Sequence, residues 1–313
     1  MFSKRLLPEL IREICRESSW HVECLSNDWI LEITHDQFPG KKLHIFGYQW
    51  DLNPAAVQMI AADKVATSQI LSLHGVSHSE HALLLNPSYD QKWLPNEGVQ
   101  SYCDNLLKKA SFPLVIKPKN GSLGTHVSLV QNVDEARGAI YDLFALNRDV
   151  ALSPYIQSEF EYRCIVLDNE ILLTYRKILP SIIGDGVRTV RELLEVHNEA
   201  LLLKYLDQNT LQTIVAVGEH KVLSWKHNLS KGAKAEFVGE PDPAMIDLVK
   251  KAVRAIGMVF CSVDVLFDEM ANSWKVLEIN SGVTINKCIP ALPRGREDAK
   301  EIFRKAIEWY FNH

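Results

Sequence analysis

An apolar strand that ends in lysines and a glycine loop is the first stretch whose residue types could do chemistry. Residues 112–127 contain an apolar strand pattern that reaches Lys117 and a loop with Gly121 and Gly124. A lysine ammonium group beside glycine amides offers charge and N–H donors that suit phosphate oxygens. The loop is neither a P-loop nor a G-x-G-x-x-G pattern. Taken alone, the stretch is also compatible with a hairpin whose lysines lie in solvent.

Three oxygen-bearing side chains in a later apolar hairpin form the second such feature. Asp264 lies within one strand pattern, and Glu278 and Asn280 lie two residues apart on the next, which places those two on one face. Antiparallel pairing through the short turn between the strands can bring Asp264 beside them. Three oxygen donors on rigid strands suit Mg²⁺ or Mn²⁺, especially an ion that also holds substrate phosphates. The alternative is a solvated sheet face with no metal.

The composition limits the kinds of protein that could carry these two stretches. The 313 residues are 47% hydrophobic and 23% charged, which is typical of a globular chain with a large core. The formal net charge of −5 argues against a nucleic-acid partner for the whole protein. The six cysteines show no CxxC spacing, which favours reduced thiols in a cytoplasmic protein. No apolar run reaches the roughly 18 residues of a membrane span, and the N-terminus is typical of an amphipathic helix rather than a signal peptide.

The elements that position these stretches alternate between helix and strand, which indicates an α/β or α+β fold. Asp63 begins a helix that ends at Gly75, and Asp168 with Asn169 forms a turn between two strands. Capping-box spacings begin helices after Asn132 and after Thr189, the second of which we expect to run to about residue 205. A strongly amphipathic helix occupies residues 241–257.

In the order of these motifs the sequence resembles the ATP-grasp superfamily of carboxylate–amine ligases, over roughly residues 60–290. Within it, the likeness is to the branch that contains cyanophycin synthetase, the ligase half of bifunctional glutathione synthetase and the ribosomal-protein glutamate ligase. The segments 180–194, with Gly184-Asp185-Gly186, and 228–232 carry that likeness. The resemblance implies an ATP-grasp fold with three parts: an N-terminal domain (1–62), a central subdomain with the lid loop (63–152) and a C-terminal subdomain with the metal site (153–313).

The resemblance also implies a role for individual residues. The expected nucleotide-binding residues are Lys64, Lys117, Gly121, Ser122, Gly124, Ser153, Tyr155, Ile156, Glu161 and Asn228. The cations expected to orient the carboxylate substrate and its intermediate are Arg163, Arg176 and Lys226. The expected ligands of Mg²⁺ or Mn²⁺ are Asp264, Glu278 and Asn280. Within residues 151–163, backbone atoms would contact adenine and Glu161 the ribose.

Some positions depart from the superfamily's pattern. Ser153 stands where the hinge usually has an acidic residue, and Lys226 stands where the branch often has an arginine. D-alanine–D-alanine ligases have an arginine two residues before the metal aspartate. Ser262 occupies that position here, which argues against that activity.

Three functions are compatible with a nucleotide–metal site of this kind. The favoured one is an ATP-dependent ligase that joins a carboxylate to an amine, on amino acids or small peptides, and releases ADP and phosphate. A small-molecule kinase on the same fold and a nucleotide-binding regulator without turnover are the alternatives. The expected partners are therefore small molecules, with neither nucleic acid nor membrane, and a homodimer is left open.

Overall fold

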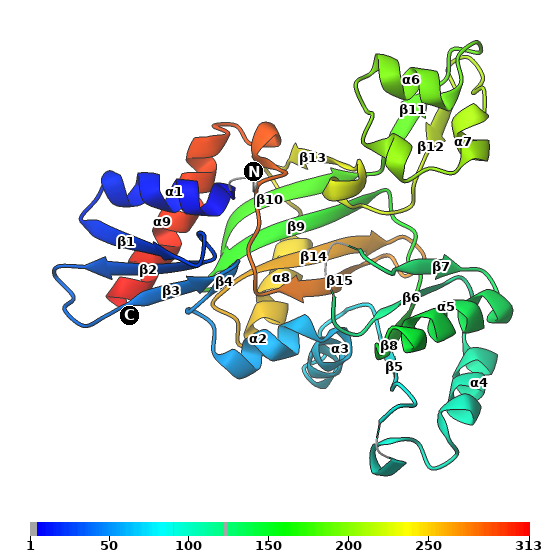
Figure 1. Ribbon diagram of the computed structural model, residues 1–313, viewed down its shortest axis with the longest axis horizontal. Helices are drawn as coiled ribbons and strands as arrows, with labels where there is room; N and C mark the ends of the chain where they lie inside the picture. Colours follow the sequence, from blue (N-terminus) through cyan, green and yellow to red (C-terminus); the bar gives the residue numbers. More distant parts are fainter. Residues whose placement is uncertain (1–4, 90, 122–123) are drawn as a thin grey trace.

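A computed structural model describes residues 5–89, 91–121 and 124–313. These residues form three larger antiparallel sheets with helices packed against them (Figure 1). The α/β expectation is confirmed. The first sheet is N-terminal and has the order β1-β2-β3-β4: β1 (Trp20–Leu25), β2 (Ile30–His35), β3 (Leu43–Phe46) and β4 (Gln49–Trp50). Helix α1 (Leu6–Arg16) packs on its inner face, where Leu31, Ile33, Leu43 and Ile45 alternate with outward residues.

The second sheet carries the lysine strand and has the order β5-β8-β6-β7. Its strands are β5 (Ala82–Leu84), β6 (Leu114–Pro118), β7 (Ser128–Val130) and β8 (Val150–Pro154). Helices α4 (Val99–Lys109) and α5 (Val133–Ala145) share its core, and the short 3₁₀ helix η1 (Gln91–Trp93) precedes α4. The Asn132 side chain accepts a hydrogen bond from the Glu135 amide at 3.0 Å, so the predicted helix start is confirmed.

The third sheet carries the acidic hairpin and has the order β13-β10-β9-β14-β15. Its strands are β9 (Phe160–Leu167), β10 (Glu170–Ile178), β13 (Lys234–Phe237), β14 (Phe260–Asp268) and β15 (Ser273–Asn280). Helix α8 (Pro243–Ile256) covers one face together with α2 (Ala55–Ala62) and α3 (Lys64–Leu73). The Asp63 side chain caps α3 by accepting from the amides of Val65 and Ala66 at 3.0 Å each, as the sequence predicts.

A small unit projects from the third sheet at the upper right of Figure 1. It contains the two-stranded sheet of β11 (Ser181–Ile183) and β12 (His220–Val222), with α6 (Val190–Val196), η2 (Leu202–Lys204) and α7 (Gln208–Gln212). Thr189 and Glu192 form the predicted capping box. The helix is shorter than expected, because α6 ends at Val196 and Asn198 has a positive φ of 56°. The chain returns to the third sheet through η3 (Leu229–Lys231).

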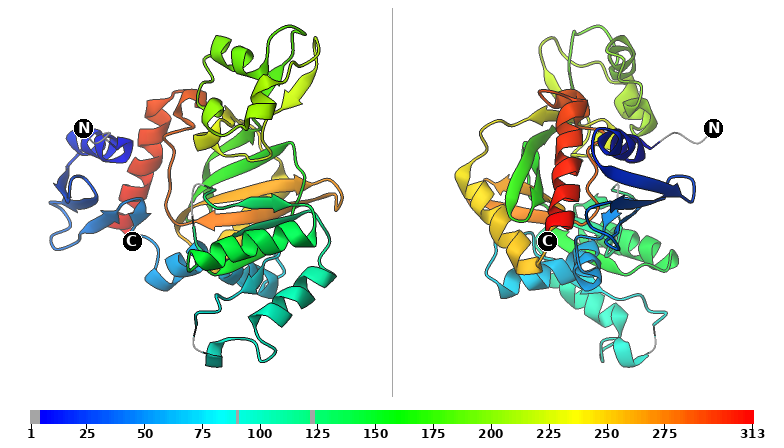
Figure 2. Two further views of the ribbon diagram at one scale, coloured as in Figure 1. Left: turned by 45° about the vertical axis from the view of Figure 1, so that its right-hand side comes forward. Right: turned by 90° about the vertical axis from the view of Figure 1, so that its left-hand side faces the viewer.

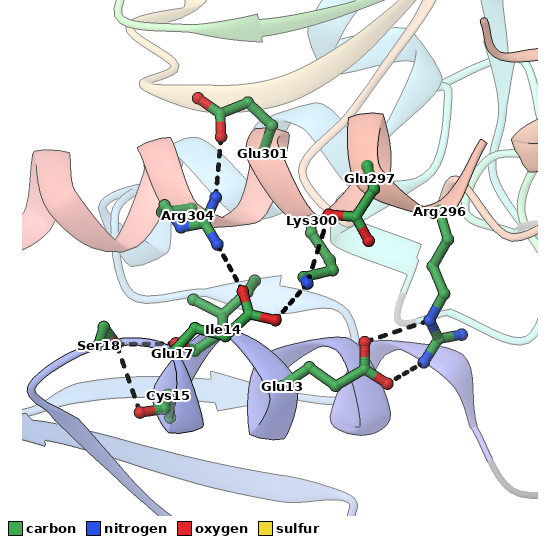
Figure 3. A network of polar contacts seen from close by, with 10 residues as sticks. All are labelled: Glu13, Ile14, Cys15, Glu17, Ser18, Arg296, Glu297, Lys300, Glu301 and Arg304. Atoms are coloured by element: carbon green, nitrogen blue, oxygen red, sulfur yellow. Dashed lines mark hydrogen bonds and ion pairs between the residues drawn. The ribbon is translucent and has the colours of Figure 1, made fainter. Parts of the chain in front are cut away.

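The C-terminal helix α9 (Arg296–Asn312), which follows η4 (Ile289–Ala291), packs beside α1 although nearly the whole chain separates them (Figure 2). Arg296 donates to Glu13 at 2.6 Å, and Glu17 accepts from Lys300 at 2.5 Å and from Arg304 at 2.9 Å (Figure 3). Beneath these pairs, α1, α9 and the N-terminal sheet share one hydrophobic core with Phe260 of β14.

The structure groups the chain differently from the three expected ranges. The N-terminal sheet shares its core with the C-terminal helix α9. Helices α2 and α3 pack on the third sheet. The expected boundary at 152–153 falls inside β8. In the part of the chain that the structure describes, no helix is both long enough and apolar enough to cross a bilayer.

The contacts of Glu17 predict a specific loss of stability. Glu17→Gln should lower the free energy of unfolding by about 1–2 kcal/mol, because Lys300 and Arg304 lose a charged hydrogen-bond acceptor. Glu9→Gln removes the same charge from the same helix, but Glu9 lies 3.7 Å from Arg296 and should change the free energy by less than about 0.5 kcal/mol. Urea denaturation of both variants measures the difference. Equal losses would show that only the overall charge of α1 matters.

Candidate nucleotide and substrate site

A cavity of about 940 Å³ lies between the second and third sheets and extends to the N-terminal sheet. Its volume is in the upper part of the range for small-molecule sites. Among the predicted site residues, those that line the cavity are Lys64, Lys117, Gly121, Gly124, Ser153, Tyr155, Ile156, Glu161, Arg163, Lys226, Asn228, Asp264, Glu278 and Asn280. Ser122 lies outside the described residues. The long-range folding of the chain therefore collects most of the predicted residues in one place.

The two lysines at the end of β6 have different surroundings. Lys117 is buried and lines the cavity, and among the described residues its ammonium group has no hydrogen-bond partner. Lys119 instead forms ion pairs with Asp63 at 3.4 Å and Asp149 at 3.1 Å. Burial lowers the pKa of Lys117 to about 8, and nearby Lys64 adds to this effect. The alternative interpretation, in which the lysines of this stretch lie in solvent, is therefore wrong for Lys117, which faces the cavity.

A buried charge cluster crosses three neighbouring strands of the third sheet. Asp264 on β14 accepts a bidentate pair from Arg163 on β9, at 2.6 Å from Nε and 2.5 Å from Nη2. Lys177 on β10 donates to Asp264 at 3.0 Å and also to Glu161. Burial alone would raise the pKa of Asp264, but Arg163 and Lys177 outweigh burial and hold that pKa well below its usual range. Burial raises the pKa of Glu161 to about 7 against the opposing charge of Lys177.

A β-bulge brings the three predicted metal-binding side chains to one face. Counting back from the turn, Asp268 pairs with Ser273 and Val265 with Val276, so unbroken pairing would place Asp264 opposite Leu277. The register shifts between Asp264 and Val265, and Asp264 pairs with Glu278 instead. Directly paired side chains lie on the same face, so the carboxylates of Asp264 and Glu278 converge.

The donor set of this face fits a divalent cation that takes its other ligands from phosphate. Glu278 and Asn280 line the cavity, and the Asn280 side-chain amide donates to Glu278 at 3.2 Å. Asp264 already accepts from two cations, so its oxygens are shared. In the described part of the chain, no group of three or more His, Cys, Asp or Glu side chains is arranged to hold a metal. An ion here would therefore depend on phosphate oxygens, as Mg²⁺ commonly does.

Three lysines hold the carbonyl groups of the glycine loop from different elements. Lys64 donates to Gly121 O at 3.1 Å, Lys231 to Gly124 O at 3.0 Å and Lys226 to Val127 O at 2.6 Å. Gly124 has a φ of +61°, and a Cβ there would lie 3.0 Å from Nδ2 of Asn228. A glycine is therefore required where the loop meets the segment 224–232. Lys226 lines the cavity as predicted, but its ammonium group contacts the loop.

The predicted hinge begins on β8, beside the lysine strand β6 in the second sheet, and lines the cavity. Ser153 is buried on β8, and the Tyr155 amide donates to Pro113 O at 3.0 Å, so that N–H group is already engaged. The Tyr155 ring meets Trp225 edge to face, with centroids 5.7 Å apart. These two aromatic rings offer an apolar surface to a planar base.

Arg176 is the predicted residue that the structure places elsewhere. Its guanidinium pairs with Glu236 at 2.5 Å and lies over the Phe160 ring, and it does not line the cavity. Counting from the Asp168 turn pairs Arg176 with Glu161, but a register shift between Ile171 and Leu173 pairs Lys177 with Glu161 instead. This single-residue shift turns Arg176 away from the cavity and turns Lys177 toward it. Lys177 thus replaces Arg176 in the site.

His81 is a second residue that sequence reasoning missed. It lines the cavity, and both its ring nitrogens are buried without a hydrogen-bond partner among the described residues. Burial lowers its pKa to about 2, and Lys117 and Lys64 contribute to that shift. No motif marks His81 in the sequence, because its neighbours in the cavity come from α3 and β6.

Comparison with known proteins shows what this chain is similar to. Residues 61–181 match the model of the RimK-like ATP-grasp domain. The chain is 28% identical over 211 residues to a glutathione biosynthesis bifunctional protein of Mannheimia succiniciproducens, which covers 55% of this chain and 28% of that protein. It is 23% identical over 245 residues to cyanophycin synthetase of Trichormus variabilis, which covers 70% of this chain and 25% of that protein. The chain thus spans about a quarter of the length of these curated relatives.

A solved structure supports the same fold. The bifunctional glutathione synthetase of Pasteurella multocida superposes with a TM-score of 0.56 at 20% identity, over 95% of this chain and 44% of that one. The resemblance inferred from the sequence motifs is confirmed. Residues 61–181 are similar to the RimK-like ATP-grasp domain, and the chain has the fold of the ATP-grasp ligases.

Proposed function

We propose that this chain is an ATP-dependent carboxylate–amine ligase that forms an amide or peptide bond through an acyl phosphate and releases ADP and phosphate. The observation that carries the proposal is a cavity that combines the buried Lys117, unpaired among the described residues, with the charge cluster of Arg163, Lys177 and Asp264. The RimK-like domain and the likeness to cyanophycin synthetase and glutathione synthetase support amino acids or small peptides as substrates.

The reaction needs no nucleophile from the protein. A substrate carboxylate oxygen attacks the γ-phosphorus of ATP, and the bond to the bridging oxygen breaks to release ADP. The substrate amine then attacks the acyl carbon, the carbon–oxygen bond to phosphate breaks, and the amine loses a proton. The protein therefore contributes positioning and charge stabilisation.

The cavity residues suit those two tasks. Lys117 and Lys64 would balance charge on the phosphates, while Tyr155 and Trp225 would hold the adenine. Arg163 is already fixed by Asp264, so it would orient the substrate carboxylate with little loss of side-chain entropy.

We further propose that Glu278 and Asn280, with Asp264 in a shared position, would hold Mg²⁺ or Mn²⁺. A bound divalent ion would supply charge neutralisation for the transferring phosphoryl group. Gly121 and residues 124–127, whose carbonyl groups accept hydrogen bonds from three lysines, would limit access of water to the acyl phosphate. The six free cysteines support a reducing, cytoplasmic location.

The products discriminate this chemistry from its alternatives. With ATP, Mg²⁺, a panel of amino acids and hydroxylamine, we expect a hydroxamate and an equal amount of ADP, because hydroxylamine captures an activated acyl group. With an amine substrate in place of hydroxylamine, one phosphate should appear for each amide bond. AMP with pyrophosphate would indicate adenylation and contradict the mechanism. A phosphorylated alcohol would establish a kinase, and absence of any turnover would favour a regulator.

The pKa of Lys117 predicts how ATP affinity depends on pH. Its ammonium group is charged below about pH 8 and loses its proton above that value, so ATP affinity should be constant below pH 8 and fall as the pH rises further. Lys117→Met should weaken ATP binding by about 1.5–3 kcal/mol at pH 7 and flatten this dependence. Calorimetry measures both effects. Lys119→Met is the matched control and should keep the wild-type profile, since Lys119 pairs with Asp63 and Asp149.

The converging carboxylates predict a coupling between metal and nucleotide. In the wild type, Mg²⁺ should increase ATP affinity, and in Glu278→Gln this increase should be lost while the thermal unfolding midpoint stays close to that of the wild type. Glu240→Gln, an exposed site that does not line the cavity, serves as the control. The readout is ATP affinity by calorimetry with Mg²⁺ or with a chelator. An unchanged Mg²⁺ effect in Glu278→Gln would exclude Glu278 as a ligand.

A further inference from the structure

An aromatic ledge, made of Trp29, Phe46 and Tyr48, lies on the N-terminal sheet at the edge of the cavity. Trp29 is 45% exposed and Phe46 is 59% exposed, so together they present an apolar patch to solvent. The two rings meet edge to face with centroids 6.1 Å apart. Trp29 and Tyr48 both line the cavity, so the ledge continues the cavity wall onto the surface.

The ledge is held rigidly by local contacts. The Arg5 guanidinium lies 4.4 Å from the Trp29 ring centroid and 4.7 Å from that of Tyr48. It also donates to the carbonyl oxygens of Asp28, at 2.9 Å, and of Gly47. Gly47 has a φ of +65°, and a Cβ there would lie 3.1 Å from the Trp29 ring. These contacts favour the observed arrangement of the Trp29 and Tyr48 rings before a ligand binds.

The position of the ledge relates it to the substrate rather than to the nucleotide. Gln49 forms a β-bridge with Gly282, and a Cβ on Gly282 would lie 3.3 Å from Cβ of Tyr48. Gly282 follows Asn280 by two residues, so the ledge adjoins the end of the cavity beyond the carboxylate face. The hinge with Tyr155 lies on the second sheet, whereas the ledge belongs to the first, on the other side of the third sheet in Figure 1.

The ledge continues into a short row of apolar side chains on the outer face of the N-terminal sheet, and charged residues border that row. Leu25, Ile30 and Phe46 are direct cross-strand neighbours on the outer face of the sheet. The next outward position on β2 is Glu32, which binds Lys42 at 2.9 Å and His44 at 3.0 Å. A bordered apolar surface joined to a cavity suits one side chain of a small ligand better than the broad face of a partner protein.

We propose that the aromatic ledge binds an aromatic or large aliphatic side chain of the amino acid or peptide substrate. The inference rests on the proposed ligase function and specifies its substrate class. The cations Arg163 and Lys177 would hold the reacting carboxylate inside the cavity, and Tyr48 and Trp29 would cover the apolar group at the mouth. Burying such a group against aromatic rings stabilises the complex, while a small side chain leaves the ledge in water.

Binding measurements test this inference separately from turnover. Calorimetry with phenylalanine, leucine, alanine, Gly-Phe and Gly-Ala is performed in the presence of Mg²⁺ and a non-hydrolysable ATP analogue. The wild type should bind at least one phenylalanine or leucine ligand about tenfold more tightly than its alanine counterpart. Trp29→Ala should remove this preference and Trp29→Phe should retain it. Trp93→Ala is the matched control, because Trp93 is exposed but does not line the cavity, and it should behave as the wild type.

Each outcome supports or overturns the inference. No preference for large apolar side chains in the wild type, or equal effects of Trp29→Ala and Trp93→Ala, would overturn it. Phosphate release with small amino acids, without a preference for large apolar side chains, would leave the ligase function intact and exclude the ledge as a substrate-binding surface. Ledge-dependent binding without formation of ADP or phosphate would support the binding role of the ledge and contradict the ligase function. A wild-type dimer that Phe46→Ser converts to a monomer would assign the ledge to a second copy and overturn the inference.

Discussion

The neutralisation of one buried carboxylate is the constraint on which the site depends. Asp264 is 1% exposed in the middle of an apolar sheet, and an unpaired charge in that place would destabilise the fold strongly. Arg163 pairs with it from the adjacent strand β9 and Lys177 from β10, one strand further along the sheet, so β9, β10 and β14 must pair in one register. Because removal of either partner leaves a buried charge, the cluster stabilises a specific geometry more than it adds net stability.

The same cluster prepares the cavity for an anionic ligand. Arg163 is held in a bidentate geometry before any substrate arrives, and Lys117 on the facing sheet forms no ion pair with the described residues, although the charge of Glu278 acts on it. Carbonyl groups of the glycine loop, which joins β6 to β7, accept hydrogen bonds from lysines of α3 and of residues 226–231. The two halves of the cavity thus have different roles in the proposed reaction, since one side is preorganised and the other offers an ammonium group without an ion pair among the described residues.

The N-terminal sheet takes its position from the C-terminal helix. The core shared by α1, α9 and Phe260 of β14 fixes this sheet against the third sheet, and the ion pairs of Glu13 and Glu17 tie the two helices together. As a result, Tyr48 lies against Gly282 and the aromatic ledge stays in line with the carboxylate face. The proposed substrate selection and chemistry would therefore rely on contacts between residues almost 300 positions apart.

Local patterns in the sequence were sufficient to predict many of the helices and strands and most of the residues that line the cavity. The caps at Asp63, Asn132 and Thr189 depend on neighbouring residues only, so their helices start where the sequence predicts. The order of the lysine strand, the hinge and the acidic hairpin was enough to recognise the ATP-grasp fold. Residues at alternate positions of one strand, such as Glu278 and Asn280, share a face whatever the strand packs against.

The tertiary structure decided which side chains converge across strands. A bulge at Asp264 pairs it with Glu278, and a register shift near Leu173 exchanges Arg176 for Lys177. Each shift moves pairing by a single residue, which reverses the face of a side chain and leaves no signal in composition or periodicity. His81 and the aromatic ledge depend likewise on packing between distant elements. The sequence alone therefore determined which chemistry the chain could carry, and only the folded sheets determined which residues are placed to perform it.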